Sequence, residues 1–151
     1  MKLFAYYLLS MMALSCSVRA QDANPVQWHF SIEKKESGLY SLKAEATIKD
    51  QFHIWALDAG GDGSLIPTSF QVADSAAFVW KGPWQETPKP HTQTLEFVDG
   101  AVHWHEKTVT FYRLFQAPVN TAVSLQVSFQ SCNEASCFPP ETQTFMLRVK
   151  E

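Results

Sequence analysis

The chain reads Ser128-Phe-Gln-Ser-Cys-Asn-Glu-Ala-Ser-Cys-Phe-Pro-Pro-Glu-Thr142 around Cys132 and Cys137, which are separated by four residues. Apolar and polar residues alternate on both sides of these cysteines, with apolar residues at Val123, Leu125, Val127, Phe129, Phe145, Leu147 and Val149. Alternation with a period of two is typical of half-buried strands, so we expect the cysteines at or beside the tip of a β-hairpin. Pro139 and Pro140 provide no backbone N–H groups, and the returning strand therefore cannot be fully paired just after Cys137. The second cysteine should lie near an unpaired edge that a partner protein can reach.

A disulfide between Cys132 and Cys137 closes a very short loop, and the chain-entropy model assigns such a loop only about 2 kcal/mol of stabilisation. A disulfide that served stability alone would gain more by joining distant strands. A structural hairpin disulfide, a pair of reduced thiols and half of a metal site are the alternatives to a redox-active pair at this point.

Val127-Ser-Phe-Gln-Ser-Cys-Asn-Glu-Ala-Ser-Cys-Phe-Pro-Pro-Glu-Thr142 resembles the active-site segment of the N-terminal periplasmic domain of the DsbD family, the transmembrane thiol:disulfide interchange reductases. The aromatic-Gln-small-Cys string and the Cys-aromatic-Pro-Pro-Glu-Thr string carry the resemblance, which extends more faintly over nearly all of residues 21–151. The spacing of Cys132 and Cys137 is one residue shorter than in the best-known members. The resemblance implies an all-β, immunoglobulin-like antiparallel β-sandwich.

The same resemblance assigns site residues. In the family, an aromatic residue on a cap loop covers the disulfide until a partner docks, and two aromatic residues on one strand flank the cysteines. The cap position corresponds to Trp104, with Phe97 as the alternative. The flanking positions correspond to His53 and Trp55, where the family has tyrosines, and Phe138 follows the second cysteine. A charged histidine near a thiol stabilises the thiolate, although His53 also fits an ordinary strand residue.

The function that the resemblance implies is thiol:disulfide interchange in the periplasm. Cys132 and Cys137 would take electrons from a thioredoxin-like donor and pass them to oxidised periplasmic proteins, in processes such as cytochrome c biogenesis. No organic cofactor is required, because the cysteines carry the two electrons. A separate membrane transporter would supply electrons from the cytoplasm. In the family the second cysteine forms the mixed disulfide, which predicts that Cys137 meets the partner and Cys132 resolves the intermediate.

Two other functions remain open from the sequence. One is a non-catalytic immunoglobulin-like binding module whose hairpin disulfide is only structural. The other is a metal site, since His103 and His105 would share one face of a strand and could join His91 or the cysteines. We prefer to interpret the histidines as surface residues that flank Trp104, and we expect no metal. No serine-histidine-acid order or pair of carboxylates indicates a hydrolase.

Residues 1–20 have the pattern of a secretory signal peptide. Lys2 gives a positive start, residues 3–14 are apolar, and Val18-Arg-Ala20 offers small residues for cleavage before Gln21. The apolar stretch is too short to span a bilayer comfortably as a permanent helix. We therefore expect export to the periplasm and removal of this segment.

Cys16 lies within this expected signal peptide and raises a second possibility. Acylation of Cys16 would make the protein a lipoprotein held on a membrane surface. Ala13 is a poor residue three positions before such a cysteine, so this alternative is disfavoured.

The charge balance argues against a nucleic-acid partner. The chain has 12 basic and 15 acidic side chains, and removal of Lys2 and Arg19 with the signal peptide makes the remainder more acidic. No basic run is available to neutralise phosphates. Residues 21–151 suit one domain with a sizeable core, and no repeat or linker divides them.

The rest of the chain alternates in short runs separated by turns. This pattern, without sustained helical spacing, predicts a sandwich of antiparallel strands. We expect turns at residues 37–38 and 50–51 and loops at residues 59–64 and 84–94. We expect strands at residues 26–33, 40–48, 52–57, 66–72, 77–80, 95–98, 102–106, 108–115, 123–129 and 145–149.

Overall fold

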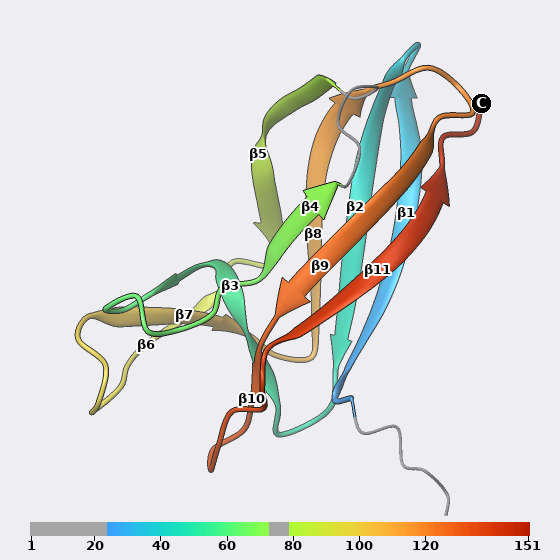
Figure 1. The fold of residues 1–151 in the computed structure, drawn as a ribbon. Coiled ribbons are helices and arrows are strands. Elements are labelled where there is room, and N and C mark those ends of the chain that lie inside the picture. The colour runs from blue at the N-terminus through green and yellow to red at the C-terminus, as the bar shows by residue number, and fades with distance from the viewer. Residues whose placement is uncertain (1–23, 73–78) are drawn as a thin grey trace, which may run out of the picture.

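The computed structural model describes residues 24–72 and 79–151, and within them it contains eleven β-strands and no α-helix. Figure 1 shows their arrangement. In chain order they are β1 (Val26–Glu36), β2 (Leu39–Ile48), β3 (His53–Gly60), β4 (Ser69–Val72), β5 (Val79–Thr87), β6 (His91–Thr94), β7 (Ala101–His105), β8 (Thr108–Gln116), β9 (Ala122–Phe129), β10 (Ser131–Cys132) and β11 (Glu141–Arg148).

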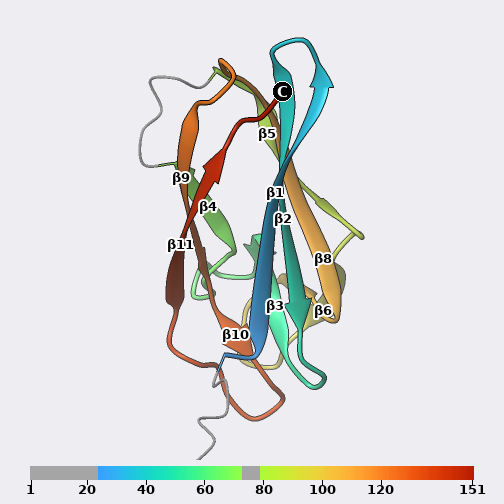
Figure 2. The same cartoon turned by 90° about the vertical axis from the view of Figure 1, so that its right-hand side faces the viewer.

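Two sheets form the layers of a sandwich. One layer is the four-stranded sheet β1-β2-β8-β5, and the other is the three-stranded sheet β11-β9-β4. Neighbouring strands pair antiparallel in both layers. Figures 1 and 2 show β9 and β11 lying across from β1 and β2. The predicted all-β antiparallel sandwich is therefore confirmed.

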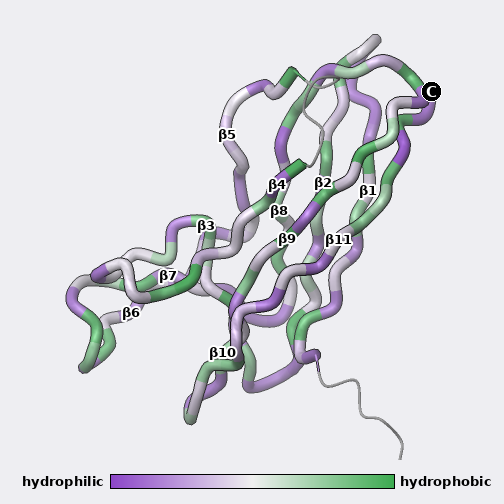
Figure 3. The backbone as a smooth tube through the Cα atoms, in the orientation of Figure 1, coloured by the Kyte–Doolittle hydropathy of each residue, from purple (hydrophilic) through white to green (hydrophobic). Residues whose placement is uncertain are grey.

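The core follows from the alternation along the strands. In β9 the side chains of Val123, Leu125, Val127 and Phe129 are all fully buried, while the residues between them reach the surface. The ring of Trp28, from the opposite layer, lies 5.4 Å from that of Phe129. Figure 3 shows hydrophobic and hydrophilic residues following one another along these strands. Burial of the apolar face of each sheet against the other is the main stabilising contribution.

A third sheet, β10-β3-β7-β6, extends from one end of the sandwich (Figure 1). Glu86 of β5 connects it to the four-stranded layer. Its Oε2 accepts a hydrogen bond from the backbone N–H of Leu57 in β3 at 3.0 Å. The same oxygen lies 3.1 Å from Nε2 of His105 in β7. A single carboxylate thus fixes two strands of the third sheet to the main body.

Several predicted boundaries between residues 59 and 98 are wrong. The expected loop at residues 84–94 contains the end of β5 and all of β6. Pro88 and Pro90 lie between these strands and remove N–H groups only there. Residues 95–98, expected as a strand, lie in the turn between β6 and β7, and Ala59 and Gly60 belong to β3.

The expected signal peptide, residues 1–20 with Cys16, lies outside the described residues, as do residues 73–78. Between residues 24 and 72 and from residue 79 onward, the chain forms no helix with the length and apolar character needed to cross a bilayer.

The disulfide should contribute less to folding than the core. We expect the double variant Cys132→Ala, Cys137→Ala to fold and to lose about 2 kcal/mol of unfolding free energy, because the loop that it opens is short. Phe111→Ala, at a fully buried position, should lose about 3–5 kcal/mol. Urea unfolding followed by tryptophan fluorescence measures both. A double-cysteine variant that does not fold would instead make the disulfide a structural staple.

Candidate active site

The loop between β10 and β11 is organised by Asn133. Its Oδ1 accepts hydrogen bonds from the backbone N–H groups of Ala135 and Ser136, each at 2.9 Å. Its own backbone N–H donates to the carbonyl of Ser136 at 2.9 Å. A short polar side chain that binds the following backbone is typical of a tight turn. The turn brings Cys137 opposite Cys132, and a disulfide joins them.

The two prolines end strand pairing as expected. The backbone N–H of Phe138 donates to the carbonyl of Ser131 at 2.8 Å, and Nε2 of Gln130 donates to the carbonyl of Phe138 at 3.1 Å. Beyond Phe138 the chain is unpaired until β11 begins at Glu141. Pro139 and Pro140 have no N–H to offer, so the loop cannot extend the β9–β11 hairpin.

The two cysteines differ in exposure to solvent. Cys132 belongs to β10 and is only 2% exposed, whereas Cys137 lies in the loop and is exposed. A partner protein therefore has access to Cys137 first. This asymmetry agrees with the exposure expected from the sequence.

Strand register places the predicted site residues on one face of the third sheet. Cys132 in β10 is opposite His53 in β3. Trp55, two residues farther along β3, is opposite Trp104 in β7, which is opposite His91 in β6. Directly opposed residues share a face of a sheet, as do residues two apart along one strand. All five residues consequently lie on the same face.

This face borders a hollow of about 510 Å³. Both cysteines line it, and so do three residues predicted from the sequence: His53, Trp55 and Trp104. The other residues that line it are Gln51, Phe52, Gln93, Leu95, Val102, Glu106, Asn133 and Glu134. The structure thus brings together residues from four strands, β3, β6, β7 and β10, and from the segments that connect them, around the disulfide.

Trp104 packs between two histidines. The ring of His91 stacks on it with centroids 4.6 Å apart, and the ring of His53 lies 5.2 Å away on a tilted plane. Nε2 of His91 is 3.7 Å from Oε1 of Glu106. His53 also contacts Trp55 edge-on at 5.1 Å. These contacts fix the orientation of the indole that borders the hollow.

The electrostatics of the hollow centre on His53. Burial lowers the pKa of its imidazole, and the negative charge of Glu106 opposes this shift in part. His53 is the one basic side chain among the residues that line the hollow, and Glu106 and Glu134 are the acidic ones. The site therefore carries a neutral, partly buried imidazole beside the disulfide at neutral pH.

Two predicted residues lie away from the hollow. Phe97, the alternative cap, is 90% exposed in the turn between β6 and β7 and does not line the hollow. Phe138 packs its ring against Phe52, with centroids 5.6 Å apart. Phe52 itself lines the hollow, so Phe138 supports one wall from behind.

The histidines of β7 were expected at the surface, and this is wrong for His105. His105 is 2% exposed, because it faces the core and binds Glu86. His103 is partly buried, and its Nδ1 lies 3.1 Å from the hydroxyl of Thr92. Within residues 24–72 and 79–151, no three histidine, cysteine or acidic side chains gather as metal ligands.

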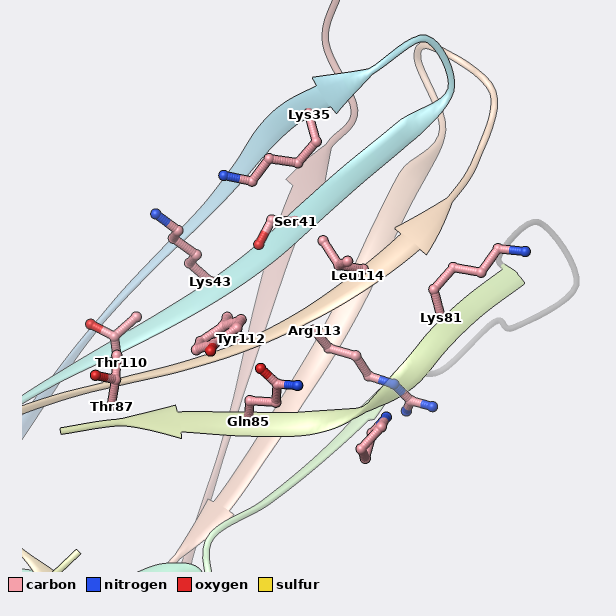
Figure 4. A pocket seen from close by; sticks show the side chains of 11 residues that line it. Lys35, Ser41, Lys43, Lys81, Gln85, Thr87, Thr110, Tyr112, Arg113 and Leu114 are labelled. Carbon is pink, nitrogen blue, oxygen red and sulfur yellow. The ribbon is translucent and has the colours of Figure 1, made fainter. Parts of the chain in front are cut away.

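A second hollow, of about 480 Å³, lies on the outer face of the four-stranded layer (Figure 4). Lys35, Lys43, Lys81 and Arg113 line it, and Glu33 forms ion pairs with Lys35 and Lys43 at 3.0 and 2.6 Å. This basic cluster is not apparent in the sequence, because its cations come from separate strands. No cysteine or histidine lines it, so it is distinct from the disulfide site.

Four residues of the disulfide site were not predicted from the sequence. Leu95, Val102 and Glu106 line the hollow, and His91 stacks on Trp104. Alternation could have placed Val102 and Trp104 on one face of a strand. The pairing of β7 with β3 and β6 that turns this face toward the cysteines is not visible in local pattern.

Comparisons with known proteins agree on the fold. No curated protein sequence matches the chain. Among solved structures, the reduced N-terminal domain of DsbD from Neisseria meningitidis superposes with a TM-score of 0.61 at 12% identity, over 84% of this chain and 87% of that one. The N-terminal periplasmic domain of ScsB from Proteus mirabilis gives 0.64 at 13% identity, over 85% of this chain and 48% of that one.

A third structure, the complex between the DsbD and PilB N-terminal domains of Neisseria meningitidis, gives a TM-score of 0.57 at 14% identity, over 84% of this chain and 88% of that one. These likenesses establish an immunoglobulin-like β-sandwich. The family model for the N-terminal part of the thiol:disulfide interchange protein DsbD matches residues 17–149. Because this match covers most of the chain, the protein belongs to the family of DsbD N-terminal domains.

Proposed function

We propose that this domain works in the periplasm and relays electrons from a thioredoxin-like donor to oxidised client proteins through Cys132 and Cys137. One observation carries the proposal: the disulfide joins a buried cysteine to an exposed one, and both border a hollow lined by aromatic rings. Membership of the DsbD N-terminal family supports the same chemistry. The cysteines hold the two electrons, so the reaction requires no organic cofactor.

Reduction begins at the exposed cysteine. The donor's thiolate attacks Sγ of Cys137, a bond forms between the two proteins, and Cys132 leaves with the electron pair of the broken disulfide. A second thiolate of the donor then attacks the donor's own sulfur in this bond and releases Cys137. The donor becomes a disulfide, and Cys132 and Cys137 become thiols.

In the second half of the cycle, the reduced domain passes its two electrons to a client protein. The thiolate of Cys137 attacks a disulfide of the client and forms a mixed disulfide, while one client sulfur leaves. Cys132 then attacks Sγ of Cys137 and releases the second client sulfur as a thiolate. The original disulfide is restored, and the client has gained two electrons.

The proposed partners fit the position of the site. The β10–β11 loop, which contains the exposed Cys137, lies at the end of the molecule opposite the C-terminus (Figure 1), so a partner that docks at this end meets that cysteine. The Neisseria DsbD N-terminal domain is known in complex with a PilB N-terminal domain, and ScsB has a related periplasmic domain. A separate membrane protein would supply electrons from the cytoplasm.

Trp104 is the proposed cap. Its ring borders the same hollow as both cysteines and is held between His91 and His53. An exposed disulfide would otherwise react with unrelated thiols. Rotation of the Trp104 side chain on docking would admit the partner's sulfur.

The reduction potential distinguishes this function from that of a binding module with a structural disulfide. We expect a potential between about −300 and −120 mV, the range of exchangeable protein disulfides. Equilibration in redox buffers followed by alkylation and mass measurement gives this value. A potential below about −300 mV would favour the structural disulfide.

Removal of the cap should expose the disulfide. Trp104→Ala is expected to accelerate reduction by a small thiol by about tenfold, equivalent to the loss of about 1.4 kcal/mol of shielding. Phe97→Ala is the matched control and should leave the rate unchanged, since Phe97 does not line the hollow. The opposite ranking of the two variants would assign the cap to Phe97.

The exposed cysteine should form the mixed disulfide. In Cys132→Ser the resolving thiol is absent, so a disulfide between Cys137 and a thioredoxin-like protein should accumulate. Cys137→Ser should accumulate far less, because the remaining thiol is buried. Non-reducing gels of each reduced variant mixed with an oxidised partner measure the product. A higher yield from Cys137→Ser would reverse the assignment.

A further inference from the structure

Resolution by Cys132 poses a chemical difficulty. The thiolate, not the thiol, attacks a disulfide, and burial in apolar surroundings raises the pKa of a thiol. Cys132 is 2% exposed and packs with Trp55, Ala59 and Val102. Water has little access to its sulfur, so a neighbouring group should take the proton.

His53 is the group placed to do so. It is directly opposite Cys132 in the β3–β10 pair, and such pairs have Cβ atoms about 4.5–5.5 Å apart. Both residues line the hollow. Contacts with Trp55 and Trp104 hold the imidazole on this face.

The other titratable groups around His53 are less suited. Glu134 is exposed on the loop, and the carboxylate of Glu106 lies near Nε2 of His91. A carboxylate is also a far weaker base than imidazole toward a thiol, since its ordinary pKa is lower. His91 is on β6, two strands from β3, and lies against Trp104, so it is farther from Cys132 than His53 is. Cys137 is the residue that Cys132 attacks, so it cannot act as the base.

We propose that His53 is the catalytic base that deprotonates Cys132 during resolution, an inference that rests on the proposed exchange function. A ring nitrogen of His53 takes the proton from Sγ of Cys132. The resulting thiolate attacks Sγ of Cys137, the bond between Cys137 and the client breaks, and the client's thiolate leaves with the electron pair. The proton then passes from the imidazolium to solvent or to that thiolate. In the reverse direction the imidazolium returns the proton to Cys132.

The protonation state of His53 agrees with this role. Because burial lowers its pKa, and the charge of Glu106 only partly opposes the shift, the imidazole is unprotonated at neutral pH. The basic form is lost only when the pH falls through this lowered pKa. Resolution in the native protein should therefore be nearly independent of pH around neutrality and should slow in acid.

The test measures the rate at which Cys132 resolves a mixed disulfide, with a small-molecule disulfide in place of the client protein. The reduced domain is mixed with 5,5′-dithiobis(2-nitrobenzoate): attack by Cys137 releases one coloured thiolate, and resolution by Cys132 releases a second. Cys132→Ser should release only the first. In His53→Gln and His53→Phe we expect the second release to slow by about a hundredfold at neutral pH, while the first release still takes place. The slowed rate should rise with pH about tenfold per unit, because hydroxide or free thiolate then supplies the reaction.

His103→Gln serves as the matched control, since it removes an imidazole of the same sheet that does not line the hollow, and it should leave the second release unchanged. Equal thermal unfolding of the variants shows that the fold is retained, and His53→Gln answers the question if His53→Phe disturbs packing. A native rate and pH profile in His53→Gln would overturn the role of His53 and leave the exchange function standing. Absence of the second release in the native protein would instead contradict the exchange function itself.

Discussion

At Gln130 the chain stops pairing with one strand and begins to pair with another, and the site depends on this change. Up to Phe129 the strand pairs with β11 and fills the core of the sandwich, and from Ser131 it pairs with β3 in the third sheet. The prolines at 139 and 140 make the change necessary, because a strand that contained them could not pair with the continuing chain. Gln130 stabilises the crossing with its hydrogen bond to the carbonyl of Phe138. The buried cysteine is therefore held by backbone pairing, while its partner sulfur remains on a loop.

The third sheet is small, and its position relative to the sandwich determines the shape of the hollow. Glu86 binds β3 and β7 at once, through Leu57 and His105. His105 is buried and Leu57 is partly buried, so competition from water for these hydrogen bonds is reduced. The residues that border the disulfide thus belong to strands anchored to a packed core. Such support keeps catalytic side chains in place more precisely than loops do.

Local pattern was sufficient to predict part of this arrangement. Alternation predicted the β9–β11 hairpin, and the prolines predicted that Cys137 would be the exposed cysteine. Long-range register was not predictable: no local signal shows that His53 pairs with Cys132, or that His105 turns toward Glu86. The missed strand β6 has four exposed residues and no apolar alternation, since only its pairing with β7 makes it a strand. The resemblance to the DsbD family supplied the positions of His53, Trp55 and Trp104, which composition and spacing could not.

The secondary structure around Trp104 bears on how a cap can open. In the family that the sequence resembles, the covering residue lies on a loop, whereas Trp104 lies within β7 and is paired with Trp55 on one side and His91 on the other. Displacing its backbone would break pairing on both sides of β7, but turning its side chain would cost only side-chain contacts, those with two imidazoles and those with the cluster around Trp55 and Cys132. Aromatic ring contacts contribute about 0.5–1.5 kcal/mol each. In the proposed exchange, a docking partner would offset that amount with a few contacts of its own, and the Trp104 side chain would turn over a fixed sheet.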